Sequence, residues 1–314
     1  MIVTENLCKK YNKVEAIKNL NLNVRQGTVF GFVGENGAGK TTTLSILATL
    51  TLPTTGRAYI GGVEVTTDAP HVRRLIGYMP DQFGVYDDLT VKEYLAFYGT
   101  AYGVASSLIE ERTKDLLQMV SLSSKEHFYV NSLSKGMQQR LGLARSLMHD
   151  PPVLILDEPA SGLDPRSRIE MREIIKGLRE RGKTILISSH ILPELADMCD
   201  EIGIIAHGTL VACAGVEVVN ARVQGQKQLF IEVLAKGNRL ADHLMTRHDV
   251  TDILVADERH VEFLFSGSEE AQVDLFRDLS VHEFAIKSFR EVGSSLEELF
   301  MRLTEEEHVS SLSS

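Results

Sequence analysis

Apolar and polar positions in the first fifty residues predict two strands followed by a helix. Residues 19–24 (NLNLNV) alternate between polar and apolar side chains, as in a strand with one buried face. Gly27 marks a turn, and residues 29–33 (VFGFV) form a continuous apolar run, as in a strand buried on both faces. Residues 41–50 have the pattern of a helix, so a glycine-rich loop connects a buried strand to a helix.

Two later apolar runs also end in chemically active side chains. Residues 153–156 (VLIL) predict a buried strand that ends in two carboxylates, and residues 184–189 (TILISS) predict another that ends in a histidine. Residues 131–148 predict a loop that enters a helix, with an apolar stripe of ordinary core packing. Parallel strands that alternate with helices are the pattern of an α/β fold.

The pattern changes after about residue 220. It predicts a βαββαβ order, with strands at 229–234, 252–255, 261–265 and 282–289 and helices at 240–245 and 269–279. A helix at 295–303 that opens with a capping box then closes the chain. We therefore expect one domain over residues 1–220, a small α+β domain over 225–304, and a flexible tail over 305–314.

Composition supports two folded domains and excludes several classes of protein. The 314 residues are 43% hydrophobic, which is enough for a full core, and the formal net charge of −10 argues against a nucleic-acid binder. Residues 225–314 hold 18 Asp and Glu against 9 Lys and Arg. The three cysteines form no CxxC pair, and their spacing indicates neither a disulfide framework nor a zinc site. We find no signal peptide and no apolar run long enough to span a bilayer.

The glycine-rich loop has the residues of a phosphate-binding loop. Its glycines let the backbone N–H groups point at phosphates, the lysine adds a positive charge, and the following helix presents its positive end. A threonine hydroxyl at the start of the helix suits Mg²⁺, and the next threonine suits an inner phosphate. The ATP-binding residues that we predict are Gly34, Glu35, Asn36, Gly37, Ala38, Gly39, Lys40, Thr41 and Thr42.

The carboxylates at the end of the run 153–156 complete this chemistry. Asp157 is predicted to hold Mg²⁺ together with Thr41, and Glu158 to polarise the water that attacks the terminal phosphorus. We expect His190 to contact the terminal phosphate, although it could also cap its strand. The catalytic residues that we predict are therefore Glu158, His190 and Lys40.

A second anion site is predicted in the loop before the helix of residues 131–148. Ser134 and Gly136 offer a hydroxyl and free N–H groups at a helix N-terminus. One chain seldom needs two such sites for one phosphate. We expect this site to serve ATP held by another copy, which predicts a head-to-tail dimer around two ATP molecules.

Together these motifs resemble the nucleotide-binding subunit of an ATP-binding cassette (ABC) transporter over residues 1–220. The resemblance implies a P-loop NTPase cassette with a RecA-like core, an antiparallel β subdomain and a helical subdomain, followed by a ferredoxin-like α+β domain. It places Ser134, Lys135 and Gly136 in the signature loop, and Asp164 at the contact with the opposite subunit. It also makes Tyr11 the residue that stacks on adenine, although an aromatic here could simply cover the core.

The chain departs from the family pattern at two points. The signature commonly reads LSGGQ, whereas this chain has Lys135 and Met137 at its third and fifth positions. The glutamine that senses Mg²⁺ aligns with Asp81, one residue before Gln82, and we favour Gln82 as the metal ligand. Neither departure puts the use of ATP in doubt.

The resemblance also implies partners and a location. The C-terminal region, with its ending SLEELF, is similar to that of single-cassette exporters of drugs, antibiotics, sodium or polysaccharide, where regulation or dimer support is expected. We expect an integral membrane permease and a second cassette as partners, no nucleic acid, and a peripheral position on the cytoplasmic face of the membrane. The alternatives are a soluble cassette ATPase acting on DNA or the ribosome, and a P-loop kinase or GTPase, which leaves Ser134, Gly136 and His190 unexplained.

Overall fold

The computed structural model describes residues 1–81, 84, 88–215, 227–255, 257–282 and 284–292. It divides into an N-terminal unit, Met1–Val216, and a C-terminal unit, Glu217–Ser314. The predicted helix at 295–303, the predicted tail and Gln82 lie outside the described residues. None of the helices in the described part of the chain has the length and apolarity that a bilayer crossing demands.

The N-terminal unit contains a six-stranded sheet in the order β10-β9-β3-β8-β7-β6. Its strands from β9 to β6 pair in parallel, and β10 pairs antiparallel with β9. The central strands are fully buried because their side chains are apolar on both faces. The strands are β3 (Val29–Val33), β6 (Ile76–Met79), β7 (Val153–Asp157), β8 (Thr184–Ser189), β9 (Glu201–Ala206) and β10 (Thr209–Gly215).

A second, antiparallel sheet of this unit has the order β2-β1-β4-β5. Its apolar side chains join a core shared with β3, β7 and the first helix. The alternating segment 19–24 lies within its second strand, with Leu20, Leu22 and Val24 buried. The strands are β1 (Ile2–Tyr11), β2 (Val14–Val24), β4 (Thr55–Ile60) and β5 (Val63–Glu64).

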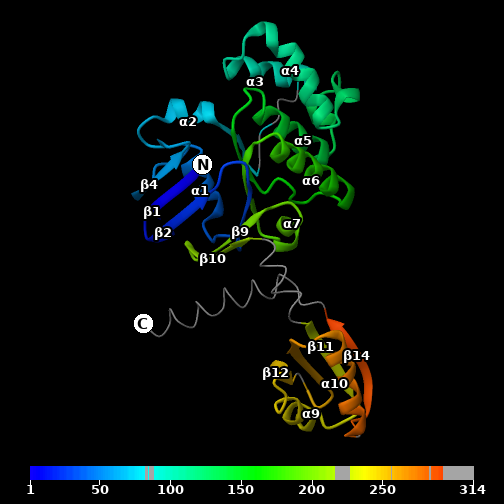
Figure 1. Ribbon diagram of the computed structural model, residues 1–314. Helices are drawn as coiled ribbons and strands as arrows, with labels where there is room; N and C mark the ends of the chain where they lie inside the picture. The colour runs from blue at the N-terminus through cyan, green and yellow to red at the C-terminus, as the bar shows by residue number, and fades with distance from the viewer. Residues whose placement is uncertain (82–83, 85–87, 216–226, 256, 283, 293–314) are drawn as a thin grey trace. The chain divides into compact units, whose positions relative to one another are not determined.

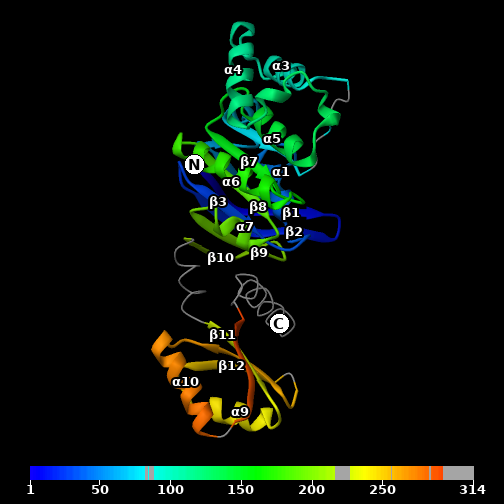
Figure 2. The same cartoon turned by 90° about the vertical axis from the view of Figure 1, so that its right-hand side faces the viewer.

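Helices flank these sheets, and α3 and α4 lie at the end of the unit farthest from β10 in both views (Figures 1 and 2). The predicted helix at 41–50 is shorter than expected, because Thr49 adopts φ +61° two residues after the helix ends. The helices are α1 (Lys40–Leu47), α2 (Ala69–Leu75), α3 (Val91–Ala101), α4 (Ser106–Met119), α5 (Lys135–Ser146), α6 (Pro165–Glu180) and α7 (Leu192–Ala196), with short 3₁₀ turns at Ser123–Lys125 and Val130–Ser132.

The C-terminal unit has the predicted βαββαβ order and an antiparallel sheet in the order β12-β13-β11-β14, which is the ferredoxin-like arrangement. Both helices pack on one face of the sheet, where Leu240 and Leu275 share a core with Phe263. The last strand begins at Ile286, later than predicted, because His282 caps the preceding helix. The elements are β11 (Lys227–Val233), α9 (Gly237–Leu244), β12 (Val250–Val255), β13 (His260–Phe265), α10 (Glu269–Val281) and β14 (Ile286–Val292).

Candidate nucleotide site

The loop between β3 and α1 curls tightly around the start of the helix. Gly39, the N-cap of α1, has φ +111°, and a Cβ there would lie 2.5 Å from the carbonyl oxygen of Ala16. Gly34 is equally crowded, since its Cβ would lie 2.4 Å from the carbonyl oxygen of Ile205. Gly37 has φ +86° but open space around it, so only its backbone conformation demands glycine.

The N-terminus of α1 is suited to an anion. No side chain caps it, and its first turn contains no acidic residue. The free N–H groups and the positive end of the helix dipole are therefore available to a negatively charged ligand.

Lys40 is buried and directs its ammonium group along the loop. Its Nζ donates to the carbonyl oxygens of Gly34 at 2.6 Å and Glu35 at 3.2 Å. The same Nζ lies 3.6 Å from a carboxylate oxygen of Glu158. A buried ammonium held in this way is preorganised to meet a phosphate with little further loss of side-chain freedom.

Glu158 follows β7 and connects the lysine to the histidine at the end of β8. Its second carboxylate oxygen lies 2.9 Å from Nδ1 of His190, which fixes the relative orientation of the two side chains. Glu158 has φ +50°, an uncommon conformation for a residue that is not glycine. Uncommon backbone conformations of this kind cluster at functional sites.

Ser188, on β8, holds both carboxylate residues and was missed by the sequence analysis. Its hydroxyl donates to Asp157 and accepts the backbone N–H of Glu158 at 3.0 Å. The parallel pairing of β7 with β8 places Asp157 directly opposite Ser188. The only sequence signal was a serine next to the end of an apolar strand, which does not identify its partners.

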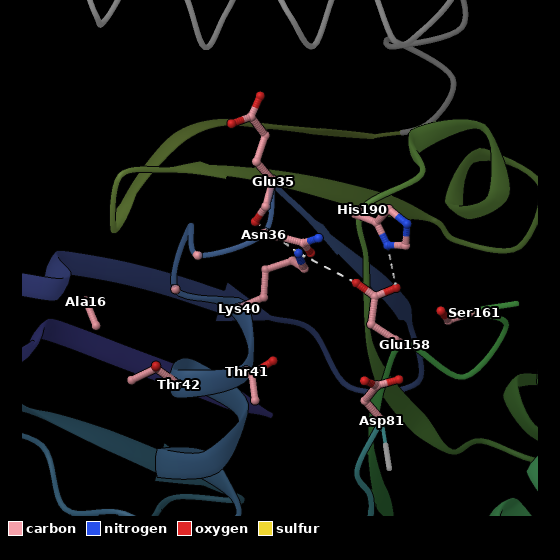
Figure 3. Close-up of a pocket in the computed structure, with 12 residues that line it drawn as sticks. Ala16, Glu35, Asn36, Lys40, Thr41, Thr42, Asp81, Glu158, Ser161 and His190 are labelled. Atoms are coloured by element: carbon pink, nitrogen blue, oxygen red, sulfur yellow. Dashed lines mark hydrogen bonds and ion pairs between the residues drawn. The ribbon is translucent and has the colours of Figure 1, made fainter.

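The glycine-rich loop, Lys40, Glu158 and His190 surround a cavity of about 310 Å³ (Figure 3). It lies at the carboxyl ends of β3, β6, β7 and β8, where ligands of parallel α/β sheets bind. Figure 3 shows Lys40 and His190 both directed toward the carboxylate of Glu158. Its lining residues are Ala16, Glu35, Asn36, Gly37, Gly39, Lys40, Thr41, Thr42, Asp81, Glu158, Ser161 and His190.

Four of the residues predicted for this site do not line the cavity. Gly34 and Ala38 are buried in the loop behind it, and Asp157 is 1% exposed and bonded to Ser188. Tyr11 ends β1 with an exposed ring, and the ammonium of Lys9 lies 4.8 Å from the centre of that ring. Gln82 lies outside the described residues, whereas its neighbour Asp81 lines the cavity.

The predicted signature residues also lie apart from the cavity lining. Ser134 is exposed and caps α5 by accepting the N–H of Met137 at 3.4 Å. Gly136 is buried against the neighbouring helix α6, since a Cβ there would lie 2.5 Å from Oγ of Ser167. Lys135 is exposed beside them. Glycine at position 136 thus lets the N-termini of α5 and α6 approach closely.

Asp164 lies at the N-terminus of α6, the helix against which Gly136 packs. It caps α6 by accepting the N–H of Ser167 at 2.9 Å and its hydroxyl at 3.1 Å. These hydrogen bonds from Ser167, the hydroxyl first, lower the pKa of Asp164 below its usual value. Asp164 and the loop of Ser134–Gly136 therefore lie on adjoining helix ends within one chain.

The chemistry of the cavity lining fits a nucleotide phosphate chain and a magnesium ion. Gly37 and Gly39 line the cavity, and a buried ammonium and uncapped helix N–H groups face the same space. The hydroxyl of Thr41 and the carboxylate of Asp81 add oxygen atoms, the donor type that Mg²⁺ prefers. Ala16 and Ser161 complete the lining, and no motif identified Ala16.

Comparisons with known proteins agree with this geometry. Residues 17–161 match the family model described as ABC transporter. The chain is 30% identical to the linearmycin resistance ATP-binding protein LnrL of Bacillus subtilis (strain 168), over 97% of this chain and 98% of the relative. It is 34% identical to the bacitracin transport ATP-binding protein BcrA of Bacillus licheniformis, over 96% of this chain and 97% of the relative.

A solved structure gives the same result. An ATP-binding cassette solved as a dimer in a post-hydrolysis state, bound to ADP and Pi, superimposes with a TM-score of 0.63 at 27% identity. The match covers 69% of this chain and 99% of that cassette.

Proposed function

Because this chain belongs to the ATP-binding proteins of ABC transporters, we propose that it pairs with a second copy around two ATP molecules and drives a separate membrane permease. The chain is an ATPase of that family, and the predicted family resemblance and cassette fold are confirmed. The observation that carries the proposal is the cavity at the strand ends, where Lys40 and His190 both contact the carboxylate of Glu158.

The phosphate chain of ATP is held by the loop between β3 and α1. The backbone N–H groups of the loop residues that line the cavity and the ammonium of Lys40 bind the phosphate oxygens. To do so, Lys40 exchanges its bonds to the loop carbonyls for bonds to phosphate, at little cost in side-chain entropy. Thr42 lies in the lining at the start of the helix, where it reaches an inner phosphate.

Thr41 and Asp157 would hold Mg²⁺, Thr41 from the cavity lining and Asp157 from its buried position behind it. Asp81 is a third oxygen donor in the lining. When bound, the ion neutralises charge on the phosphate oxygens. Ser188 keeps the carboxylate of Asp157 in place through its hydroxyl hydrogen bond.

Glu158 acts on the attacking water. Its carboxylate is anchored by Lys40 on one oxygen and by His190 on the other. Once Lys40 turns to phosphate, one carboxylate oxygen is released to accept a proton from water in line with the terminal phosphorus. His190 keeps Glu158 oriented through Nδ1 and contacts the terminal phosphate with the rest of its ring.

The site of one copy is completed by the signature loop of the other. Ser134 and Lys135 are exposed at the N-terminus of α5, away from the cavity of their own chain. A helix N-terminus with a hydroxyl and a nearby ammonium is suited to the terminal phosphate of ATP bound by a second copy. The dimeric cassette with ADP and Pi supports this pairing, and Asp164 on the adjoining helix lies at the contact.

Tyr11 stacks on the adenine base. Its ring is exposed at the end of β1, within 4.8 Å of the Lys9 ammonium, so one face of the ring already contacts a cation. An exposed ring offers stacking area to a planar base at little entropic cost.

The permease that we propose exports a small molecule, an ion or a lipid-linked cargo. Two relatives that match nearly the whole chain are named for linearmycin resistance and bacitracin transport. Because both relatives are named as ATP-binding proteins, the transport role that we propose includes a separate membrane partner. We place the chain at the cytoplasmic face of the membrane, attached to that partner.

The proposed dimer is tested with Glu158→Gln, which removes the proton acceptor but keeps its shape. We expect the purified variant with ATP and Mg²⁺ to have twice the monomer mass in light scattering, and with ADP the monomer mass. Adding Ser134→Arg should abolish the dimer, whereas Ser106→Arg, at an exposed position on α4, should not. A monomer in every nucleotide, or a dimer unaffected by Ser134→Arg, contradicts the head-to-tail arrangement.

A further inference from the structure

Two helices of the C-terminal unit bring two histidines and an aspartate together at their C-terminal ends. His243 lies in the last turn of α9, Asp278 in the last turn of α10, and His282 caps α10. Nε2 of His243 lies 2.8 Å from one oxygen of Asp278, and Nδ1 of His282 lies 3.2 Å from the other. One ligand atom from each residue can be chosen so that all three lie within 4.8 Å of one another.

The surroundings favour a cation at this point. The C-terminal end of a helix dipole is negative, and the ends of both α9 and α10 contribute to the same place. The two imidazole rings lie with centroids 4.4 Å apart, and the ring of Phe284 lies 5.6 Å from that of His243. This packing limits the positions that the His243 ring can adopt.

A hydrogen bond of His282 shows which of its ring nitrogens is free to bind a metal. Its Nδ1 also lies 2.9 Å from the backbone carbonyl oxygen of Asp278, and a carbonyl can only accept, so Nδ1 carries the hydrogen. In the neutral ring Nε2 therefore keeps a free lone pair. A histidine that donates one N–H to a carbonyl while the other nitrogen binds metal is the usual arrangement in metal sites.

The nearby guanidinium of Arg247 does not replace a metal at this cluster. It lies 3.8 Å from Asp278 but makes two shorter hydrogen bonds to Asp249, at 2.8 and 2.7 Å. The positive charge of Arg247 is thus balanced mainly by Asp249. The carboxylate of Asp278 remains the charged partner of the two histidines.

We propose that His243, Asp278 and His282 form a site for a transition-metal dication such as Zn²⁺, which links α9 to α10. Two imidazoles and one carboxylate are a ligand set that suits zinc, with water at the fourth position. Ligands of one zinc ion lie about 3–4 Å apart, and one ligand atom of each of the three residues lies within 4.8 Å of the others, so side-chain rotations would bring them to one ion. His282 is free to make such a rotation because its side chain is exposed.

The direct test is a titration of metal-free full-length protein with Zn²⁺ by calorimetry, without nucleotide. His243→Ala, His282→Gln and Asp278→Asn should each lose one binding site or weaken it by at least about tenfold. His248→Ala is the matched control, an exposed histidine shortly after α9, and should bind zinc like the unsubstituted chain. Other zinc ligands of the chain, such as its cysteines, are unchanged in all four variants.

Thermal unfolding and circular dichroism distinguish a lost metal site from a folding defect. Zn²⁺ should raise the thermal unfolding temperature of the C-terminal unit in the unsubstituted chain and in His248→Ala, but not in the three ligand variants. His282→Gln changes an exposed side chain, so its far-UV circular dichroism should match that of the unsubstituted chain. The proposal is wrong if the unsubstituted chain binds no zinc at micromolar concentration, or if the folded ligand variants bind it as tightly.

Discussion

The two units place their polar side chains by different means. In the N-terminal unit the parallel strands of one sheet end at the same edge, so the loops that follow β3, β7 and β8 meet at one cavity. In the C-terminal unit the neighbouring strands run antiparallel, and the chemical groups gather where two helices end. The site of the N-terminal unit therefore consists of sequence motifs that each follow a parallel strand. The cluster in the smaller unit consists of residues that belong to no sequence motif.

Charge follows the same division. Residues 225–314 hold 18 Asp and Glu against 9 Lys and Arg, which accounts for nearly all of the net charge of −10. The N-terminal unit is close to neutral, yet its cavity holds a buried ammonium opposite a carboxylate. Among the described residues of the smaller unit, Asp249, Asp257 and Asp278 pair with histidine or arginine. The net charge of a unit thus does not show where its chemistry lies, because that chemistry depends on a few side chains such as Lys40 and Glu158.

The largest expected effect concerns the buried ammonium of the N-terminal unit. Lys40→Ala should lower the rate of ATP hydrolysis by about 100- to 1000-fold, because a preorganised charge on the phosphates is lost. Phosphate release at saturating ATP measures it. Lys114→Ala, an exposed lysine on α4, is the control and should hydrolyse ATP normally. Equal rates for the two variants would break the assignment of catalysis to the strand-end cavity.

Alanine substitutions at two glycines of the loop distinguish the cost of backbone strain from the cost of a steric clash. Gly39→Ala places a Cβ at 2.5 Å from a carbonyl oxygen and at φ +111°, whereas Gly37→Ala meets nothing within 4 Å at φ +86°. We expect Gly39→Ala to cost about 1–3 kcal/mol in the free energy of unfolding or of nucleotide binding. Gly37→Ala should cost an amount at the lower end of that range. Thermal unfolding and ATP titration measure both. A larger cost at Gly37 contradicts the described loop.

The substitution Ser188→Ala tests whether the hydrogen bonds between β8 and β7 hold the carboxylates of Asp157 and Glu158 in place. Ser188→Ala removes the hydroxyl bonds to Asp157 and to the N–H of Glu158, leaving one backbone bond at 3.2 Å. A loss of about 1–1.5 kcal/mol corresponds to roughly tenfold slower hydrolysis. Thr184→Val, at the other end of β8, loses a partly buried hydrogen bond, that from the N–H of Gly27, and should leave the rate unchanged. The two variants can differ in protein stability. Equal rates of ATP hydrolysis for Ser188→Ala and Thr184→Val would contradict the role of Ser188.

The smallest effect belongs to the C-terminal unit and depends on pH. Its hydrogen bond with His243 is the largest cause that lowers the pKa of Asp278 below the usual 3.8. A depressed carboxyl pKa stabilises the folded state above the pKa of the unfolded chain, and this contribution disappears as pH falls through the lowered value. His282 and Arg247 also face Asp278 and act in the same direction.

The comparison variant is Asp278→Asn, measured with a chelator present. The stability difference between the unsubstituted chain and this variant should be present at pH 5 and shrink as the pH falls below about 4. Denaturant unfolding of the C-terminal unit across that range measures it. A difference that grows toward acid pH would show that the histidines, not the carboxylate, control the cluster.

The cassette fold was predictable because its hydrophobic runs and its motifs agree. The apolar segments 29–33 and 153–156 are β3 and most of β7, and the glycine loop lies between β3 and α1. The order of the βαββαβ unit also followed from its alternating pattern, although the last strand starts four residues late because His282 still belongs to the helix end. Local pattern and tertiary packing favour the same elements in these segments.

Contacts across strands and helices were not predictable. Ser188 bonds to two residues thirty positions earlier in the chain, and a single sequence does not give the register that brings them together. Ala16 reaches the cavity from a different sheet. His243 and Asp278 are 35 residues apart and meet only because two helices end side by side. Each of these depends on tertiary structure that residue types alone do not encode.

The most direct test of the nucleotide site compares ATP binding with phosphate release in Glu158→Gln. The variant should bind ATP about as tightly as the unsubstituted chain, because the loop and Lys40 are intact. Its rate of phosphate release should fall by about 100- to 10,000-fold, because the proton acceptor is gone. Unchanged phosphate release, or loss of ATP binding together with hydrolysis, would contradict the role of Glu158 at the strand-end cavity.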